Sequence, residues 1–181
     1  SVRKIWHINQ YTTWKEGTKW VVAPVKGDTG FSIPQVPHTY AYHHGMFGYM
    51  NENQVAISES TLGTVRKLVN NTPAAKIDLT MLSLLGMERS RTARECIEVM
   101  GKLAETYGYG FNDDGEFFAV SDPNEMWAFE IMPVGPLWTP ETGKPGAVWC
   151  AQRLPDDHVS VCPNESRIGE IDLNNKDFFM A

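Results

Sequence analysis

The chain has 181 residues, of which 42% are hydrophobic and 21% are charged, and its 22 acidic against 16 basic side chains give a formal net charge of -6. This composition is typical of a folded globular domain, and its 8 Phe, 6 Trp and 6 Tyr exclude disorder along the whole chain. The acidic balance argues against nucleic-acid binding, which depends on clustered Lys and Arg, and no run of about 18 apolar residues predicts a membrane-spanning helix.

The N-terminal part of the chain is rich in Trp, Gly and Pro and shows no sustained period, so we expect only short extended segments there. Residues 19–25 predict a strand ended by proline. Residues 33–37 must be extended, because each proline disfavours the helical region for the residue before it. From His38 to Met50, aromatic and small residues interleave in a pattern that favours a strand.

A polar step comes next and leads into another predicted strand. Residues 51–54 read Asn-Glu-Asn-Gln and predict a turn, after which residues 55–58 predict a short strand. Residues 58–61 group three hydroxyls around a carboxylate. Because no histidine is near them in sequence, we interpret these side chains as strand-end hydrogen-bonding groups rather than as a nucleophile.

Two helices follow, each with recognisable end signals. Asp78 can accept a hydrogen bond at the start of an apolar helix, which Gly86 is expected to interrupt. Thr92 and Glu95 have the spacing of a capping box, in which both side chains accept hydrogen bonds from backbone amides at a helix start. Apolar residues then recur every three or four positions, and Gly108 is expected to end this second helix.

After the helices the period of the apolar pattern returns to two. Residues 116–121 and 126–131 predict two strands joined by a turn at 122–125. After Glu116, which begins the first strand, both strands are apolar on both faces apart from Glu130, which predicts a hairpin that is buried between two layers.

The last third of the chain is expected to hold a loop and a further hairpin. Residues 133–146 are rich in Pro and Gly, and residues 147–151 and 159–162 predict two paired strands. The order of strands, helices and strands favours a single α+β domain over residues 1–181, with mainly antiparallel sheets.

Local motifs identify no active site. His43 and His44 would point to opposite faces of a strand, so they cannot bind one ion together with His38. The chain has neither a nucleophile-elbow sequence nor a phosphate-binding loop. We therefore expect no cofactor and no metal. Three cysteines are expected to be free thiols that behave as small apolar residues: Cys96, Cys150 and Cys162.

Several segments, each weak by itself, occur together in the order of one family's motifs. Residues 51–61 match the pattern N-E-x-G-V-x-x-S-x-x-T except that Gln54 replaces the glycine, and residues 87–95 match a helix start with E-R-x-x-T-A-R-E. Further matching segments are 107–108, 121–127 with Glu130, 149–157, 162–164 and 168–171. Over residues 46–173 the chain thus resembles the PepD-type dipeptidases, which are N-terminal-nucleophile cysteine peptidases related to secernins, penicillin V acylase and bile salt hydrolase.

The resemblance implies an Ntn-hydrolase-like αββα sandwich, in which two antiparallel sheets pack face to face between layers of helices. It also implies a nucleophile that is the first residue of the mature enzyme, a cysteine whose own α-amino group acts as the base. Ser1 and the residues after it do not resemble that start. We therefore expect an internal fragment of a longer enzyme, incomplete at the N-terminus and, from its apolar residues 178–180, also at the C-terminus.

Two asparagines correspond to site residues of the resembled family. Asn51 matches an amide that donates to the oxyanion of the tetrahedral intermediate, and Asn164 matches an asparagine that orients the α-amine of the nucleophile. Their alternative interpretations are a turn residue for Asn51 and a strand-end cap for Asn164. Arg153 and Asp157 lie in a matching motif and are interpreted as structural.

The function expected from the resemblance is hydrolysis of dipeptides or short peptides, with homo-oligomerisation left open. No signal peptide is predicted, and a cytoplasmic and an exported location both stay open. One alternative is a catalytically inactive, secernin-like homologue that acts as an interaction protein. Another is a sugar- or peptide-binding module, suggested by a group of aromatic residues: Trp14, Trp20, Tyr40, Tyr42 and Trp138.

Overall fold

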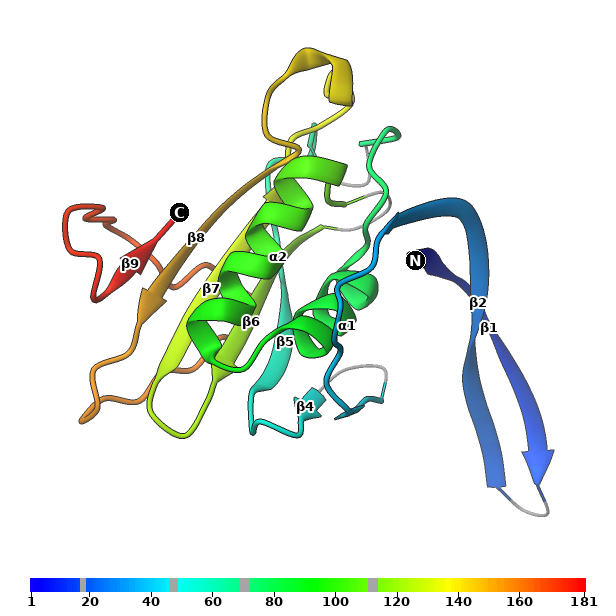
Figure 1. Ribbon diagram of the computed structural model, residues 1–181, viewed down its shortest axis with the longest axis horizontal. Helices are drawn as coiled ribbons and strands as arrows, with labels where there is room; N and C mark the ends of the chain where they lie inside the picture. The colour runs from blue at the N-terminus through cyan, green and yellow to red at the C-terminus, as the bar shows by residue number, and fades with distance from the viewer. Residues whose placement is uncertain (17–18, 46–48, 69–71, 111–113) are drawn as a thin grey trace.

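The computed structural model is described here for residues 1–16, 19–45, 49–68, 72–110 and 114–181, with only the backbone described at 7–28. Within these residues the chain forms two antiparallel sheets and two α-helices (Figure 1). The predicted α+β fold with antiparallel sheets is therefore confirmed. One sheet has two strands and the other has seven.

The two-stranded sheet is a long hairpin of β1 (Val2–Glu16) and β2 (Lys19–Pro34) that projects away from the other elements (Figure 1). Its base is anchored by Ile5 and Ile33, which are buried in the main core. The sequence pattern missed β1, and the prediction that proline ends the second strand was wrong. In a two-stranded sheet each strand keeps a free edge, where a proline without an N–H group is tolerated.

The seven-stranded sheet has its strands in chain order, and every neighbouring pair is antiparallel. Its strands are β3 (Tyr42–His43), β4 (Tyr49–Asn51), β5 (Ala56–Leu62), β6 (Gly115–Ser121), β7 (Met126–Pro133), β8 (Ala147–Arg153) and β9 (Phe179–Met180). The predicted hairpin of β6 and β7 is confirmed, with Asp122 N–H donating to the Glu125 carbonyl at the turn.

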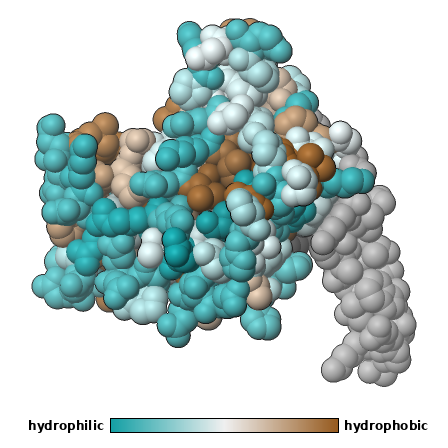
Figure 2. Space-filling model, viewed as in Figure 1, coloured by the Kyte–Doolittle hydropathy of each residue, from teal (hydrophilic) through white to brown (hydrophobic). Residues whose placement is uncertain are grey.

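Both helices, α1 (Leu79–Arg89) and α2 (Ala93–Tyr107), cover the same face of this sheet, which we call the helix face (Figure 1). Side chains such as Phe118 and Phe129 point to this face and join the main core, where their rings stack with centroids 5.9 Å apart. The outer surface over α2 is mostly hydrophilic in Figure 2, as expected for an amphipathic helix. The opposite face, which we call the far face, carries a smaller cluster around Leu62, Phe117 and Ala128.

The predicted helix ends are confirmed, with one difference in detail. Asp78 accepts a hydrogen bond from the N–H of Met81 at 2.7 Å, and Thr92 accepts one from the N–H of Glu95 at 3.1 Å. The Glu95 carboxylate accepts from the N–H of Arg91 rather than from the capping residue itself. Gly108 ends α2 with φ at 76°, a positive value that glycine adopts without steric cost.

Gly86 does not interrupt α1, contrary to the prediction. A Cβ atom at this position would lie 2.9 Å from the Sγ of Cys96 and 3.0 Å from Cγ of Met100, both on α2. The glycine therefore allows the two helices to approach closely, and the packing gained at this contact offsets its low intrinsic helix propensity.

Two predicted strands were wrong. The run from His38 to Met50 contains only β3 and the start of β4, and residues 46–48 lie outside the described part of the chain. Residues 159–162 form no strand, and Val159 is 94% exposed. β8 pairs instead with β9. The prediction failed because the alternating Val-Ser-Val pattern carries no information about which distant segment reaches the sheet edge. The loop at 133–146 is confirmed and includes a short 3-10 helix, η1 (Pro140–Thr142).

In the turn between β4 and β5, Gln54 has a positive φ, the backbone conformation that glycine would favour at this position of the family pattern. Gln54 has φ at 63°, and its N–H donates to the carbonyl of Asn51 at 2.9 Å. A side chain with a Cβ atom is sterically disfavoured at positive φ. The turn therefore tolerates a strained residue where the family pattern avoids one.

We predict that Gln54→Gly raises the free energy of unfolding by about 0.5 to 1 kcal/mol, because glycine removes the Cβ strain but adds entropy to the unfolded chain. Urea unfolding followed by circular dichroism measures the change. Gln54→Ala is the matched control, since it removes the long side chain but keeps the Cβ atom, and it should give no gain. An equal gain from both variants would contradict the strain argument.

Candidate active site on the far face of the sheet

The candidate site lies on the far face, under residues 154–173, which we call the covering segment. In Figure 1 this segment, drawn in orange, passes behind the sheet on the side away from α2. Its contacts with the far face include Leu154, Cys162 and Ile168, which pack against the small apolar cluster there. Among the described residues, the far face is thus covered by irregular chain, whereas the helices lie on the helix face.

The side chains on the far face follow from the strand register. Ser60 pairs with Phe117, which pairs in turn with Glu130, and Glu130 pairs with Cys150 across β7 and β8. Because alternate residues of a strand share a face, Ser58 and Ala119 belong to the same surface. Hydroxyl, aromatic, carboxylate and thiol groups thus form one row across four strands.

A hollow of about 210 Å³ lies between β5, β6 and the covering segment. It combines hydroxyl groups with apolar side chains, so it suits a small group that has both a polar and an apolar part. Its lining residues are Ser58, Glu59, Ser60, Phe117, Ala119, Met126, Trp127, Leu154, Ser160 and Cys162.

Glu130 connects the sheet to the covering segment. Only 4% of this residue is exposed, and its carboxylate accepts hydrogen bonds from the Ser166 hydroxyl at 2.5 Å and from the N–H groups of Arg167 at 2.5 Å and Ile168 at 3.1 Å. The sequence pattern marked Glu130 as an exception in an apolar hairpin but assigned it no role; Glu116, near the start of β6, is a further buried carboxylate of the same hairpin. The distant partners of Glu130 are separated from it by more than thirty residues, so no local signal identifies them.

Asn164 lies in the same covering segment, at the rim of the far face. Its side-chain amide donates to the carbonyl of Thr61 at the end of β5, at 3.0 Å, and the residue is otherwise exposed. Its φ is 61°, a value that asparagine adopts more readily than most residues. The predicted strand-end contact is thus present, and the role beside the nucleophile stays a prediction.

Asn51 is buried on the other side of the sheet, with 5% of the residue exposed. Its amide group donates both hydrogens to backbone carbonyls at the end of α1, those of Met87 at 3.0 Å and Ser90 at 2.8 Å. Its side-chain oxygen accepts from the N–H groups of Asn53 and Val55. In this arrangement no N–H of Asn51 is left for an oxyanion, so its catalytic role stays a prediction while its contacts are structural.

The structure does not bring the two predicted site residues together. Asn51 bonds to Val55 just before β5, and Asn164 bonds to Thr61 near the end of that strand. Six residues of strand at about 3.3 Å each place these two points roughly 20 Å apart. Only Asn164 therefore belongs to the far-face site.

Two of the three cysteines are unsuited to act as nucleophiles. Burial raises the pKa of the Cys96 thiol to about 12, and burial together with the nearby charge of Glu130 raises the pKa of Cys150 to about 11. A cysteine attacks as its thiolate, and both of these side chains are protonated at neutral pH. Cys162 lines the hollow and donates to the carbonyl of Glu165 at 3.4 Å.

Glu88 is another buried carboxylate and lies at the C-terminal end of α1, on the helix face. It pairs with the Arg3 guanidinium from β1 and accepts a hydrogen bond from the Tyr42 hydroxyl at 3.1 Å. Burial and the negative charge of Glu88 raise the pKa of Tyr42 to about 12. Unlike Glu130, this carboxylate is neutralised by a cation, and it joins the hairpin to the body of the domain.

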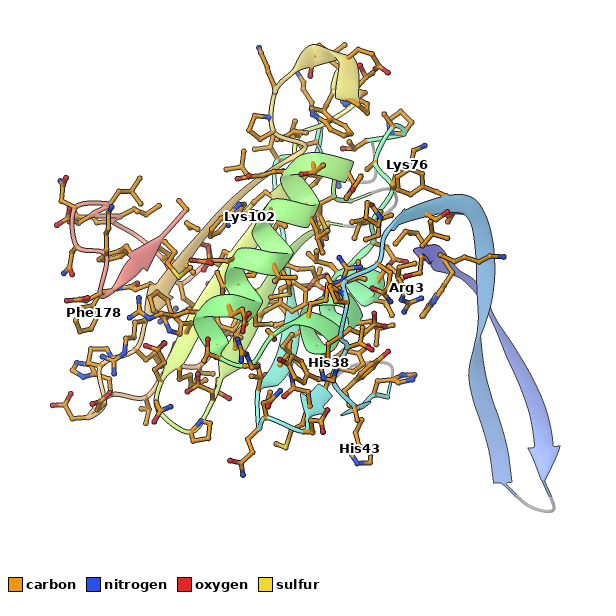
Figure 3. All side chains as sticks on the ribbon, viewed as in Figure 1. Arg3, His38, His43, Lys76, Lys102 and Phe178 are labelled. Carbon is orange, nitrogen blue, oxygen red and sulfur yellow. The ribbon has the colours of Figure 1, made fainter. Side chains whose placement is uncertain are left out.

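The described residues contain no group of three His, Cys, Asp or Glu side chains that could hold a metal ion. In Figure 3, His43 points away from the body of the molecule, and His38 and His43 do not point toward one another. In the same part of the chain, no helix is long and apolar enough to cross a membrane.

Two of the aromatic residues that suggested a sugar-binding module have partners within the domain. Trp138 is buried, with 5% exposed, and donates to the carbonyl of Lys144, while Tyr42 is bound to Glu88. The side chains of Trp14 and Trp20 lie outside the described part of the structure.

Arg153 and Asp157, interpreted as structural, make local ionic contacts. Arg153 pairs with Glu125 at 3.2 Å and with Asp156 at 2.7 Å, at the end of β8 where the covering segment begins. Asp157 is exposed, and its contact with the neighbouring His158 lowers its pKa. Neither residue reaches the hollow.

Comparison with known proteins agrees with the motif order. Residues 40–181 match the model of peptidase family C69. The chain is 35% identical over 91 residues to a probable dipeptidase B of Lactococcus lactis subsp. lactis, a match that covers 50% of this chain and 16% of that protein. It is 25% identical over 167 residues to a probable dipeptidase B of Streptococcus pyogenes serotype M1, covering 84% of this chain and 30% of that protein. The chain thus spans less than a third of the length of these relatives.

The family match includes both helices, all seven strands of the large sheet and the covering segment. It does not include the projecting hairpin of β1 and β2. It extends beyond residues 46–173, the part in which the motifs were recognised, at both ends. The resemblance to PepD-type dipeptidases is confirmed at the level of the family: this chain belongs to peptidase family C69.

Proposed function

We propose that this chain is part of a dipeptidase that hydrolyses the peptide bond of dipeptides or short peptides. The observation that carries the proposal is the match of residues 40–181 to a peptidase family. Similarity to proteins named probable dipeptidase B supports dipeptides as the substrate class.

The proposed nucleophile is an N-terminal cysteine outside this chain. Cys96 and Cys150 do not suit this role, because burial raises the pKa of both thiols and so disfavours the thiolate. In the proposed reaction, the α-amino group of the cysteine takes the thiol proton and the sulfur attacks the carbonyl carbon of the substrate. The amine product then leaves with a proton, and water hydrolyses the thioester to release the acid product.

The proposed position of this chemistry is the far face beside Asn164. Three observations favour it: the hollow lined by hydroxyl and apolar groups, the bond of the Asn164 amide to Thr61 next to the lining residue Ser60, and the absence of a helix over this face in the described residues. Asn164 is proposed to orient the α-amine of the nucleophile. For Asn51 to act as the oxyanion donor, it would have to exchange one of its bonds to the end of α1.

We predict that the 181-residue chain alone does not hydrolyse dipeptides, whereas a longer polypeptide from the same gene that begins with the mature cysteine does. Hydrolysis is followed by release of free amino acids, with the cysteine-to-alanine variant of the long form as the control. Robust hydrolysis by the short chain would contradict the external nucleophile. An inactive long form without a leading cysteine would favour the secernin-like interaction protein.

We predict that Asn51→Ala lowers the free energy of unfolding by about 2 to 4 kcal/mol, because two carbonyls and two amides lose their buried partners. Asn53→Ala is the control in the same turn, since the side-chain amide nitrogen of Asn53 has no partner in the described structure. The oxyanion role predicts in addition a fall in kcat of about two to three powers of ten in the long enzyme. An unchanged kcat of the folded variant would leave Asn51 with its structural role alone.

A further inference from the structure

Glu130 is a buried carboxylate whose hydrogen-bond donors all lie in one segment of the chain. Its three donors, one hydroxyl and two backbone N–H groups, all come from three consecutive residues of the covering segment. A buried carboxylate without hydrogen bonds is strongly destabilising, so this segment and this side chain each require the other.

The charge of Glu130 is stabilised by these hydrogen bonds in an otherwise apolar setting. Its cross-strand neighbours are Phe117 and Cys150, and the raised pKa of Cys150 reflects both burial and the Glu130 charge. Displacement of residues 166–168 would leave a buried anion without donors. The free-energy cost of that displacement keeps the segment on the sheet.

Asn164 lies two residues before the first of these donors. On its other side, its own amide is bound to the carbonyl of Thr61, so the segment is held at two points, one on β5 and one on β7. The positive φ of Asn164 sets the direction of the chain between these points. Glu130 therefore fixes one of the two anchors that determine where the Asn164 side chain lies.

We propose that Glu130 is the positioning residue for Asn164: it holds residues 166–168 on the far face so that the Asn164 amide stays bound to the carbonyl of Thr61, the residue after Ser60 of the hollow. The catalytic consequence rests on the proposed function, in which Asn164 orients the nucleophile. Glu130 itself touches neither substrate nor nucleophile in this proposal. It acts through the covering segment.

The positioning step is tested in the chain itself by hydrogen exchange. Glu130→Ala should lower the protection of the Arg167 and Ile168 amides at least about tenfold, while amides of α2 keep theirs. Glu105→Ala is the matched control, because it removes a carboxylate that accepts a hydrogen bond from Trp149 on the helix face and not from residues 166–168. Unchanged protection of Arg167 and Ile168 in Glu130→Ala would overturn the proposal.

The catalytic consequence is tested by a double-mutant cycle in the long enzyme. Glu130→Ala should lower kcat about tenfold to a hundredfold with little change in KM, since displacement of a positioned group by about 1 Å costs that much. Glu130→Gln, which keeps one acceptor oxygen, should have a kcat between that of Glu130→Ala and that of the parent enzyme. Combined with Asn164→Ala, Glu130→Ala should add no further loss. Multiplicative losses in the double variant would overturn the proposal, because they would show that the two residues act independently.

The two experiments separate the proposal from the function on which it rests. An inactive parent enzyme would contradict the proposed dipeptidase activity, and hydrogen exchange would still decide whether Glu130 holds the segment. Loss of protection at the Arg167 and Ile168 amides, together with non-additive effects of the two substitutions on kcat, supports both the positioning role of Glu130 and the proposed dipeptidase activity.

Discussion

The fold depends on a central hairpin that carries large apolar side chains on both faces. Phe118 and Phe129 lie on the helix face, and Phe117 and Ala128 lie on the far face. A sheet of this kind must be covered on both sides, because each uncovered aromatic side chain forfeits roughly 1.5 to 3 kcal/mol of burial. The two helices cover one face, and the covering segment lies over the other.

The two covers are stabilised by different physics. The helices are held by close apolar packing, including the contact that Gly86 permits between α1 and α2. The covering segment packs Leu154, Cys162 and Ile168 against the far-face cluster and is held in addition by hydrogen bonds, above all those that Glu130 accepts. A segment held by a small number of polar contacts is placed accurately yet responds to single substitutions, and such segments commonly carry function.

The part of the fold that local chemistry encodes could be predicted from the sequence. The caps at Asp78 and Thr92 depend on residues within one helical turn, and the β6–β7 hairpin depends on its own alternation and turn. The parts that failed depend on distant partners. Gly86 is explained only by the neighbouring helix, and the pairing of β8 with β9 joins segments separated by 25 residues of irregular chain, from 154 to 178.

The same distinction applies to the candidate site. The motif order correctly identified the family, since it depends on residue types and not on contacts. It could not show that Asn51 has both amide hydrogens engaged at the end of α1, nor that Asn164 lies at the opposite end of β5. Glu130 was visible only as an exception to a pattern, because its three donors come from another part of the chain.

The central claim is that the chemistry of the complete enzyme occurs on the far face beside Asn164. A crystal structure of the long polypeptide with a dipeptide analogue bound covalently to its N-terminal cysteine tests this most directly. The account predicts that the analogue lies over the far face, with the Asn164 amide within hydrogen-bond distance of the cysteine α-amine. An analogue bound on the helix face, near Asn51 and away from Asn164, would contradict it.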